Sequence, residues 1–125
     1  MCGRQPSAMR SMPSERDVQA GTDILDNARL ALEFAAGLDD EAFAADAKSF
    51  YAATRCLEII SEAARRLDAA ERERFSDLPW KAITGAGNVY RHDYGDVSPA
   101  LVWATVVRRL PQLVATAERA LGDRA

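Results

Sequence analysis

A polar cluster between positions 88 and 96 holds the residues of this 125-residue chain best suited to chemistry. It includes six groups that can donate hydrogen bonds, accept them or carry charge and that could act together: Asn88, Arg91, His92, Asp93, Tyr94 and Asp96. His92 is the only histidine, and an imidazole with a pKa of about 6.5 takes up and releases protons near neutral pH. The neighbouring amide, guanidinium and phenol could converge on one anion, and arginine's planar fork fits phosphate well. The cluster therefore favours acid–base chemistry on a phosphate group.

Other interpretations of these residues follow from the same spacing. A lone histidine is also typical of a surface or helix-capping position, and for His92 this alternative stays open. Asp93 and Asp96 match no specific metal-site spacing, so we expect neither a metal nor another cofactor. Gly85 and Gly87 follow no predicted strand and precede no Gly-Lys-Ser/Thr, so they do not predict a phosphate-binding loop. They are better explained by close helix packing or a bend.

Length and composition indicate one small globular domain. Hydrophobic residues make up 48% and charged residues 28% of the chain, and no apolar run approaches the ~18–20 residues that cross a bilayer. The net charge of −3 argues against a protein that coats nucleic acid by bulk electrostatics, although local contact with RNA needs only a small basic patch. Cys2 and Cys56 are too few and too far apart for a metal or redox pair, which favours a reducing cytoplasm.

The first part of the chain predicts a leader followed by a helix. Residues 1–13 carry two prolines and three methionines without periodicity, so we expect a disordered leader before a helical domain at 14–125. From Ser14 onward, apolar residues recur at helical spacing, and Ser14 with Asp17 is a candidate N-terminal cap. This helix should stop at Gly37, a residue suited to a left-handed C-terminal position.

Two more helices are predicted before the polar cluster. Asp39 or Asp40 is suited to cap a short helix, and a long helix follows with a charged outer face typical of a solvated surface. The apolar face of that long helix holds Phe50, Ala53, Leu57, Ile60, Ala64 and Leu67. Residues 68–77 predict a polar turn or short helix. Pro79 suits the first turn of the next helix, from which Trp80 and Ile83 should face the core.

The end of the chain predicts one last helix. Ser98 and Pro99 form an N-cap and first-turn pair, and apolar residues then recur from Leu101 to Leu121. Pro111 falls inside this pattern, so we expect a kink or a break near Arg109. No run alternates every second residue as a strand would. The sequence therefore predicts an all-α protein, an up-and-down bundle of three long helices plus one or two short ones.

Four segments of the chain resemble the HepT-like branch of the HEPN superfamily. They are LEIISEAARRL at 57–67, LPWKAITGAGN at 78–88, HDYGDV at 92–97 and VWATVVRRLPQL at 102–113, in order across nearly the whole domain. Members of this family are small helical dimers that act as ribonuclease toxins beside an MNT-type nucleotidyltransferase antitoxin. The resemblance implies a cytoplasmic homodimer with an RNA substrate and that antitoxin as its partner.

The family motif is an arginine, four residues, a histidine, one residue and a tyrosine. The resemblance implies that His92 is the catalytic histidine and Tyr94 the motif tyrosine, which the partner modifies with AMP in some pairs. Asn88 matches the residue that follows the motif arginine, but Gly87 occupies the position of the arginine itself. On a continuous helix, positions 87 and 91 share a face, and a side chain at 91 leans back toward 87. We therefore predict that Arg91 supplies the missing guanidinium.

The reaction that the resemblance implies is metal-independent cleavage of RNA, in which the 2′-hydroxyl attacks the adjacent phosphorus. His92 would transfer protons and Arg91 would stabilise negative charge on the phosphate oxygens. Gly87 favours an alternative, a degenerate HEPN module that binds its nucleotidyltransferase partner or a nucleotide and cuts nothing. A third interpretation is a plain helical dimer whose polar cluster caps a buried helix end.

Overall fold

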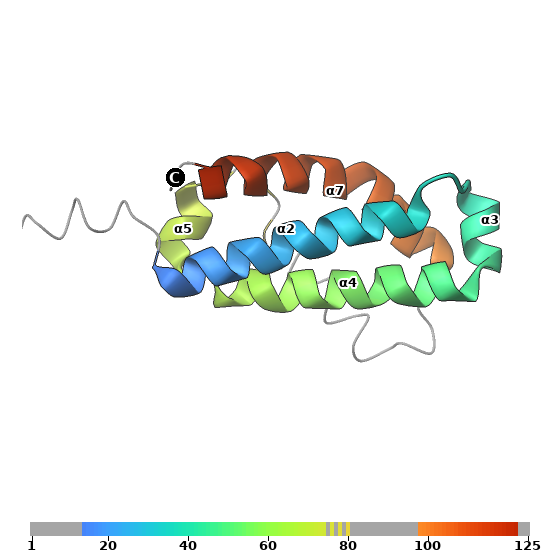
Figure 1. Cartoon of the computed structure of the whole chain (residues 1–125), viewed down its shortest axis with the longest axis horizontal. Helices are drawn as coiled ribbons and strands as arrows, with labels where there is room; N and C mark the ends of the chain where they lie inside the picture. The colour runs from blue at the N-terminus through green and yellow to red at the C-terminus, as the bar shows by residue number, and fades with distance from the viewer. Residues whose placement is uncertain (1–13, 75, 77, 79, 81–97, 123–125) are drawn as a thin grey trace, which may run out of the picture.

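The computed structural model describes residues 14–74, 76, 78, 80 and 98–122, and the regular structure among them is α-helical (Figure 1). Three helices are long and two are short. They are α2 (Glu15–Ala35), α3 (Asp40–Ala45), α4 (Ala47–Arg66), α5 (Ala69–Arg74) and α7 (Pro99–Gly122). The predicted all-α class, with three long helices and two short ones, is therefore confirmed for the described part of the chain. None of the described helices has the length and hydropathy required to cross a bilayer.

Helix α2 is the centre of the bundle. It packs along both α4 and α7, whereas α4 and α7 have little contact with each other (Figure 1). Asp23 of α2 pairs with Arg66 at the end of α4, and a Cβ atom at Gly21 would lie 3.4 Å from Cδ2 of Leu121 at the end of α7. The start of α2 therefore lies beside the ends of both other long helices, so α2 is antiparallel to α4 and to α7.

The two short helices mark the two ends of the bundle. At one end, Phe43 of α3 contacts Trp103 near the start of α7, with ring centroids 5.3 Å apart. At the other end, α5 lies beside the start of α2, as Figure 1 shows. We refer below to the α3 end and the α5 end.

Caps begin and end the helices largely where the sequence predicts. The Oγ of Ser14 accepts a hydrogen bond from the backbone N–H of Asp17, and the Asp17 carboxylate accepts one from the N–H of Ser14, so the predicted capping box is confirmed. Gly37 follows α2 with φ of 80°, a left-handed value that glycine adopts without a steric penalty. Of the two aspartates proposed to cap the short helix, Asp39 is the one that does so, accepting from the N–H of Ala42 at 2.8 Å.

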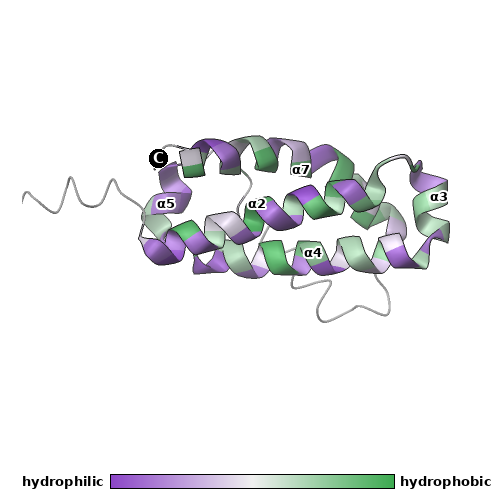
Figure 2. Cartoon of the chain, in the orientation of Figure 1, coloured by the Kyte–Doolittle hydropathy of each residue, from purple (hydrophilic) through white to green (hydrophobic). Residues whose placement is uncertain are grey.

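The core lies between the facing apolar stripes of the three long helices. Figure 2 shows hydrophobic and hydrophilic residues alternating along each of them, as amphipathic helices require. Of the core positions predicted on α4 and at its C-cap, Phe50 is half-buried and the others are buried: Ala53, Leu57, Ile60, Ala64 and, at the C-cap, Leu67. The predicted core role of Trp80 is also confirmed, because it packs half-buried against this cluster. Ile83 and Pro79 lie outside the described residues.

Helix α7 decides between the two outcomes expected near Arg109 in one respect. A break does not occur, because α7 continues through Pro111 as one helix, while the expected kink stays a prediction. A proline at 111 cannot donate to the carbonyl of Val107, but both residues lie on the exposed face, where water can satisfy that carbonyl. On the opposite face, Leu110 and Leu113 are 2% and 3% exposed, and their burial continues the core contact past the proline.

Candidate functional site

The residues of the predicted site lie outside the described residues. This applies to His92, Tyr94, Asn88 and Arg91, and to Gly87 at the position of the motif arginine. Their predicted roles therefore stay predictions. The structure does describe the residues on either side of this segment, Trp80 before it and Ser98 after it, and the scaffold that holds them.

Trp80 is anchored at the α5 end of the bundle. Its indole Nε1 donates a hydrogen bond to the backbone carbonyl of Arg72 at 3.0 Å, and its own N–H donates to the carbonyl of Leu78 at 2.9 Å. Leu78 is 5% exposed, and both side chains line an apolar cleft beside Val18 of α2. Sequence reasoning missed the Trp80–Arg72 bond. Two features of the sequence could have indicated it. A buried indole N–H needs a hydrogen-bond acceptor, and the last carbonyls of the short helix before Trp80 need donors from outside that helix.

Ser98 is anchored at the α3 end. Its Oγ accepts from the backbone N–H of Ala100 at 3.2 Å and of Leu101 at 3.4 Å, which confirms the predicted N-cap of α7. Its carbonyl accepts from the N–H of Val102 at 3.1 Å, and the Val102 side chain is fully buried in the core. Because α5 and α3 lie at opposite ends of the bundle, the segment that carries the motif joins these two ends.

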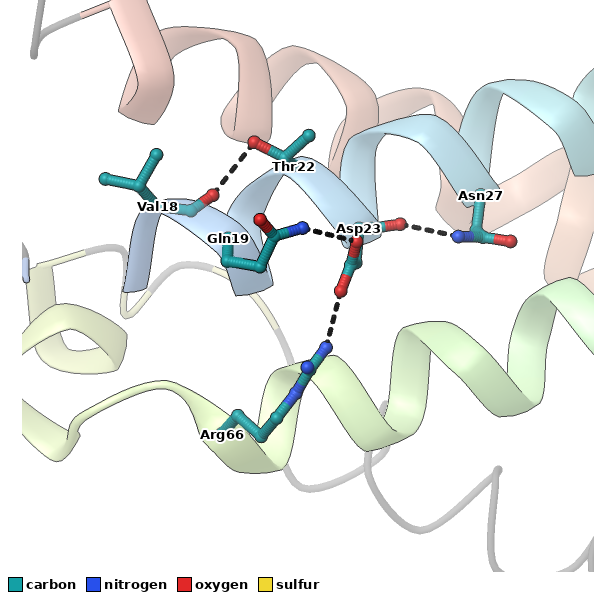
Figure 3. A network of polar contacts seen from close by, with 6 residues as sticks. All are labelled: Val18, Gln19, Thr22, Asp23, Asn27 and Arg66. Atoms are coloured by element: carbon teal, nitrogen blue, oxygen red, sulfur yellow. Dashed lines mark hydrogen bonds and ion pairs between the residues drawn. The ribbon is translucent and has the colours of Figure 1, made fainter. Parts of the chain in front are cut away.

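A polar network ties α2 to α4 near the α5 end (Figure 3). The Asp23 carboxylate accepts from Arg66 at 2.7 Å and from Nε2 of Gln19 at 3.1 Å, while the Asp23 carbonyl accepts from Nδ2 of Asn27 at 2.9 Å. The guanidinium and carboxylate neutralise each other, so this network is not an anion site. It joins the start of α2 to the end of α4 through one ion pair.

Two groups among the described residues have clearly shifted pKa values, and neither belongs to the motif. The hydrogen bond from Oγ of Ser49, at 2.9 Å, is the main cause that lowers the pKa of Asp46, which caps α4. Burial raises the pKa of the Cys56 thiol, which is 4% exposed. A protonated, buried thiol is a poor nucleophile, so Cys56 is a packing residue. The described residues also contain no group of three or more histidine, cysteine or acidic side chains placed to hold a metal.

Comparison with known proteins identifies the family. A family model described as "Ribonuclease HepT-like" matches residues 24–120, a range that includes the whole motif segment. "Putative RNase MJ1380" of Methanocaldococcus jannaschii is 37% identical over 101 residues, which is 80% of this chain and 93% of that protein. "Probable ribonuclease HepT" of Thermococcus cleftensis is 30% identical over 91 residues, covering 73% of this chain and 83% of that protein. No solved structure gives a significant match.

These matches and the helical bundle define a protein of the ribonuclease class with an all-α fold consistent with the HEPN superfamily. The chain belongs to the HepT-like ribonuclease family. The family predicted from the four sequence segments is therefore confirmed, and a ribonuclease-like function is supported.

Proposed function

We propose that this protein is the HepT-like toxin of a type VII toxin–antitoxin pair, a cytoplasmic homodimer that cleaves RNA without a metal. The observation that carries the proposal is the family match over residues 24–120, combined with His92 and Tyr94 at the family's spacing within it. The relatives named as ribonucleases support an RNA substrate.

The proposed reaction uses the RNA's own 2′-hydroxyl as the nucleophile. The 2′-oxygen forms a bond to the adjacent phosphorus, the bond from phosphorus to the 5′-oxygen breaks, and the product ends in a 2′,3′-cyclic phosphate. One imidazole takes the 2′-hydroxyl proton and another gives a proton to the leaving oxygen. His92 of each subunit supplies one of these imidazoles, while Arg91 and Asn88 stabilise the negative charge on the phosphate oxygens.

The anchored positions on either side of the motif support this assignment. A catalytic segment needs fixed ends, because small displacements of the reacting groups reduce the rate strongly. The hydrogen bond from Trp80 to Arg72 fixes one end, and the Ser98 cap with buried Val102 fixes the other. These interactions belong to the scaffold and take no part in the chemistry.

Cleavage of total RNA by the purified protein tests the proposal. We expect cleavage in the presence of EDTA, no cleavage of a DNA strand of the same sequence, and a loss of about 100-fold or more in His92→Ala. A His92→Ala protein that cuts at the wild-type rate, prepared free of host nuclease, would overturn the assignment.

The partner and its modification of Tyr94 form a separate part of the proposal. An MNT-type nucleotidyltransferase encoded beside this chain would transfer AMP from ATP to the Tyr94 oxygen and release pyrophosphate. Intact mass after incubation with that enzyme and ATP should show the added AMP, and Tyr94→Phe should gain none. Addition of AMP to Tyr94→Phe would show that another residue is the acceptor.

Gly87 favours a second candidate function. A chain that lacks the motif arginine could bind its nucleotidyltransferase partner or a nucleotide without cutting RNA. In that case the wild type and His92→Ala would be equally inactive on RNA, while both would still form a complex with the partner in gel filtration.

A further inference from the structure

Tyr51 is the most exposed of the large hydrophobic residues in the described part of the chain. Its exposed fraction is 66%, compared with 50% for Leu101, 41% for Leu30 and 39% for Val107. It lies on the outer face of α4, where a charged or small polar side chain would be the ordinary choice. The ring therefore makes little contribution to the core of this chain.

A series of aromatic contacts holds the Tyr51 ring to that core. Its centroid lies 5.1 Å from the ring of Phe50, and Phe50 meets Phe43 edge-on at 6.3 Å. Phe43 is fully buried and contacts Trp103 of α7. Offset and edge-to-face pairs at these separations are favourable, so the exposed ring is supported by its neighbours. A supported ring loses little conformational freedom when a ligand stacks on it.

Two cations flank the ring along the helix. Lys48 lies three residues before Tyr51 and Arg55 four residues after it, spacings that place all three on one face of α4. Lys48 is exposed, and the Arg55 side chain is 64% exposed. Arg55 pairs with Glu58 at 3.1 Å, and the Glu58 side chain is 18% exposed, so a phosphate bound by Arg55 competes with this carboxylate. We call Lys48, Tyr51 and Arg55 the Tyr51 platform.

The acidic groups closest in sequence to the platform already have partners. Glu58 is the partner of Arg55, and Asp46 accepts from both the N–H and the Oγ of Ser49 at the start of α4. The platform is therefore an aromatic ring with two cations, and the positive charges are partly offset by nearby acidic side chains. Such a site depends on stacking and gains only a modest electrostatic contribution.

The platform lies at the α3 end of the bundle. Phe43, which supports it, contacts Trp103, and Trp103 is five residues after the Ser98 cap that ends the motif segment.

We propose that the Tyr51 platform binds single-stranded RNA, with Tyr51 stacked on one unpaired base and Lys48 and Arg55 contacting the phosphates on either side of it. This inference deepens the proposed function and rests on it for the identity of the ligand. A base–aromatic stack with flanking cations is the ordinary way proteins hold single strands without reading their sequence. The platform would add substrate affinity outside the cleavage motif.

Binding of a strand that cannot be cleaved tests the platform separately from the chemistry. The probe is a 12-nucleotide single strand of 2′-O-methyl RNA with a 5′ fluorescein, which has no free 2′-hydroxyl, and the readout is fluorescence anisotropy. We expect Tyr51→Ala to raise Kd about tenfold or more and Tyr51→Phe to bind like wild type, because phenylalanine keeps the stacking face. Leu30→Ala, which removes another exposed hydrophobic side chain from α2, is the matched control and should leave Kd unchanged.

Charge reversal and salt test the two cations. Lys48→Glu should weaken binding, and the slope of log Kd against log salt should fall by about 0.7, because the variant neutralises one phosphate fewer than wild type does. A 12-base-pair duplex of the same sequence should compete weakly, because its bases are already stacked.

Several outcomes would overturn the platform. An unchanged Kd in Tyr51→Ala would do so, as would a Tyr51→Ala protein that changes its oligomeric state by light scattering while its affinity for the strand stays the same. The second result would assign Tyr51 to a protein contact. If the wild type binds the strand but cuts no RNA, the proposed cleavage is rejected and the binding role of the platform is retained. If Tyr51→Ala cleaves RNA with the wild-type KM, only the binding role of the platform is rejected.

Discussion

The Oδ1 atom of Asp17 accepts a hydrogen bond from the backbone N–H of Asp68 at 3.0 Å, although 51 positions separate the two residues. The other oxygen of the same carboxylate accepts from the N–H of Ser14 at 3.3 Å. Asp17 is 5% exposed, whereas the two donor residues, Ser14 and Asp68, are exposed. One carboxylate therefore closes the N-terminal cap of α2 and fixes the residue from which α5 begins.

Asp17→Ala should lower the free energy of unfolding by about 2–3 kcal/mol, because it removes two hydrogen bonds to a charged group. Urea unfolding followed by circular dichroism measures this loss. Ser14→Ala is the matched control, since it removes the serine half of the cap and should cost about 1 kcal/mol. Equal losses in the two variants would show that the bond to Asp68 contributes nothing.

The same residue shows which features the sequence could predict. The capping box was predictable because Ser14 and Asp17 lie three positions apart and a helix N-terminus requires such a pair. The bond to Asp68 depends on how α2 and α4 pack, and nothing in the local sequence at either residue encodes that distance. The presence of a helix and its caps are thus encoded locally, whereas hydrogen bonds between different helices depend on tertiary packing.

The cap of α4 should make stability depend on pH. Hydrogen bonds from Ser49 hold the pKa of Asp46 below its ordinary value. A carboxyl group with a depressed pKa in the folded state contributes its full stability above its unfolded pKa, about 3.9, and loses it as pH falls through the folded pKa. Asp46→Asn keeps an N-cap that does not titrate. Between about pH 5 and pH 2, we therefore expect the urea midpoint of wild type to fall more steeply than that of Asp46→Asn.

Urea midpoints measured for both proteins at several pH values give this difference directly, since the other carboxylates are common to the two. Parallel pH profiles would mean that the Ser49 hydrogen bonds do not stabilise the ionised form of Asp46.

Replacing Pro111 with alanine should increase the stability of the protein. The substitution restores an N–H that can donate to the carbonyl of Val107, and a proline inside a helix costs about 3 kcal/mol. Part of this gain is offset because proline also restricts the unfolded chain, by about 1 kcal/mol. We expect Pro111→Ala to raise the free energy of unfolding by about 2 kcal/mol. Pro111→Gly restores the same donor with a poorer helix former and should gain about 1 kcal/mol less.

Thermal and urea unfolding of these two variants, compared with wild type, measure the gain. A loss of stability in Pro111→Ala would show that the proline makes a packing contact that alanine cannot replace.

Pro111 also shows why the local sequence alone did not decide between a break and a continuous helix. A proline removes one hydrogen bond, but Leu110 and Leu113 on the other face are buried, and their burial favours a continuous helix by more than that bond is worth.

The candidate site shows a different limit of prediction from sequence. The four sequence segments were enough to identify the family. The proposal that Arg91 supplies the guanidinium missing at Gly87 depends instead on side-chain geometry, which spacing alone does not define.

The replacement of the motif arginine is the last prediction. If Arg91 supplies the guanidinium, Arg91→Ala should reduce kcat for RNA cleavage by about 100-fold or more, the usual effect of removing one group that stabilises charge in the transition state. Arg91→Lys keeps the charge but loses the planar fork, so its kcat should fall between those of wild type and Arg91→Ala. Adding Gly87→Arg to Arg91→Ala should recover activity, because it places the guanidinium at the family's own position. Wild-type cleavage by Arg91→Ala alone would reject this role for Arg91 and leave His92 and Asn88 as the side chains with an assigned part in the chemistry.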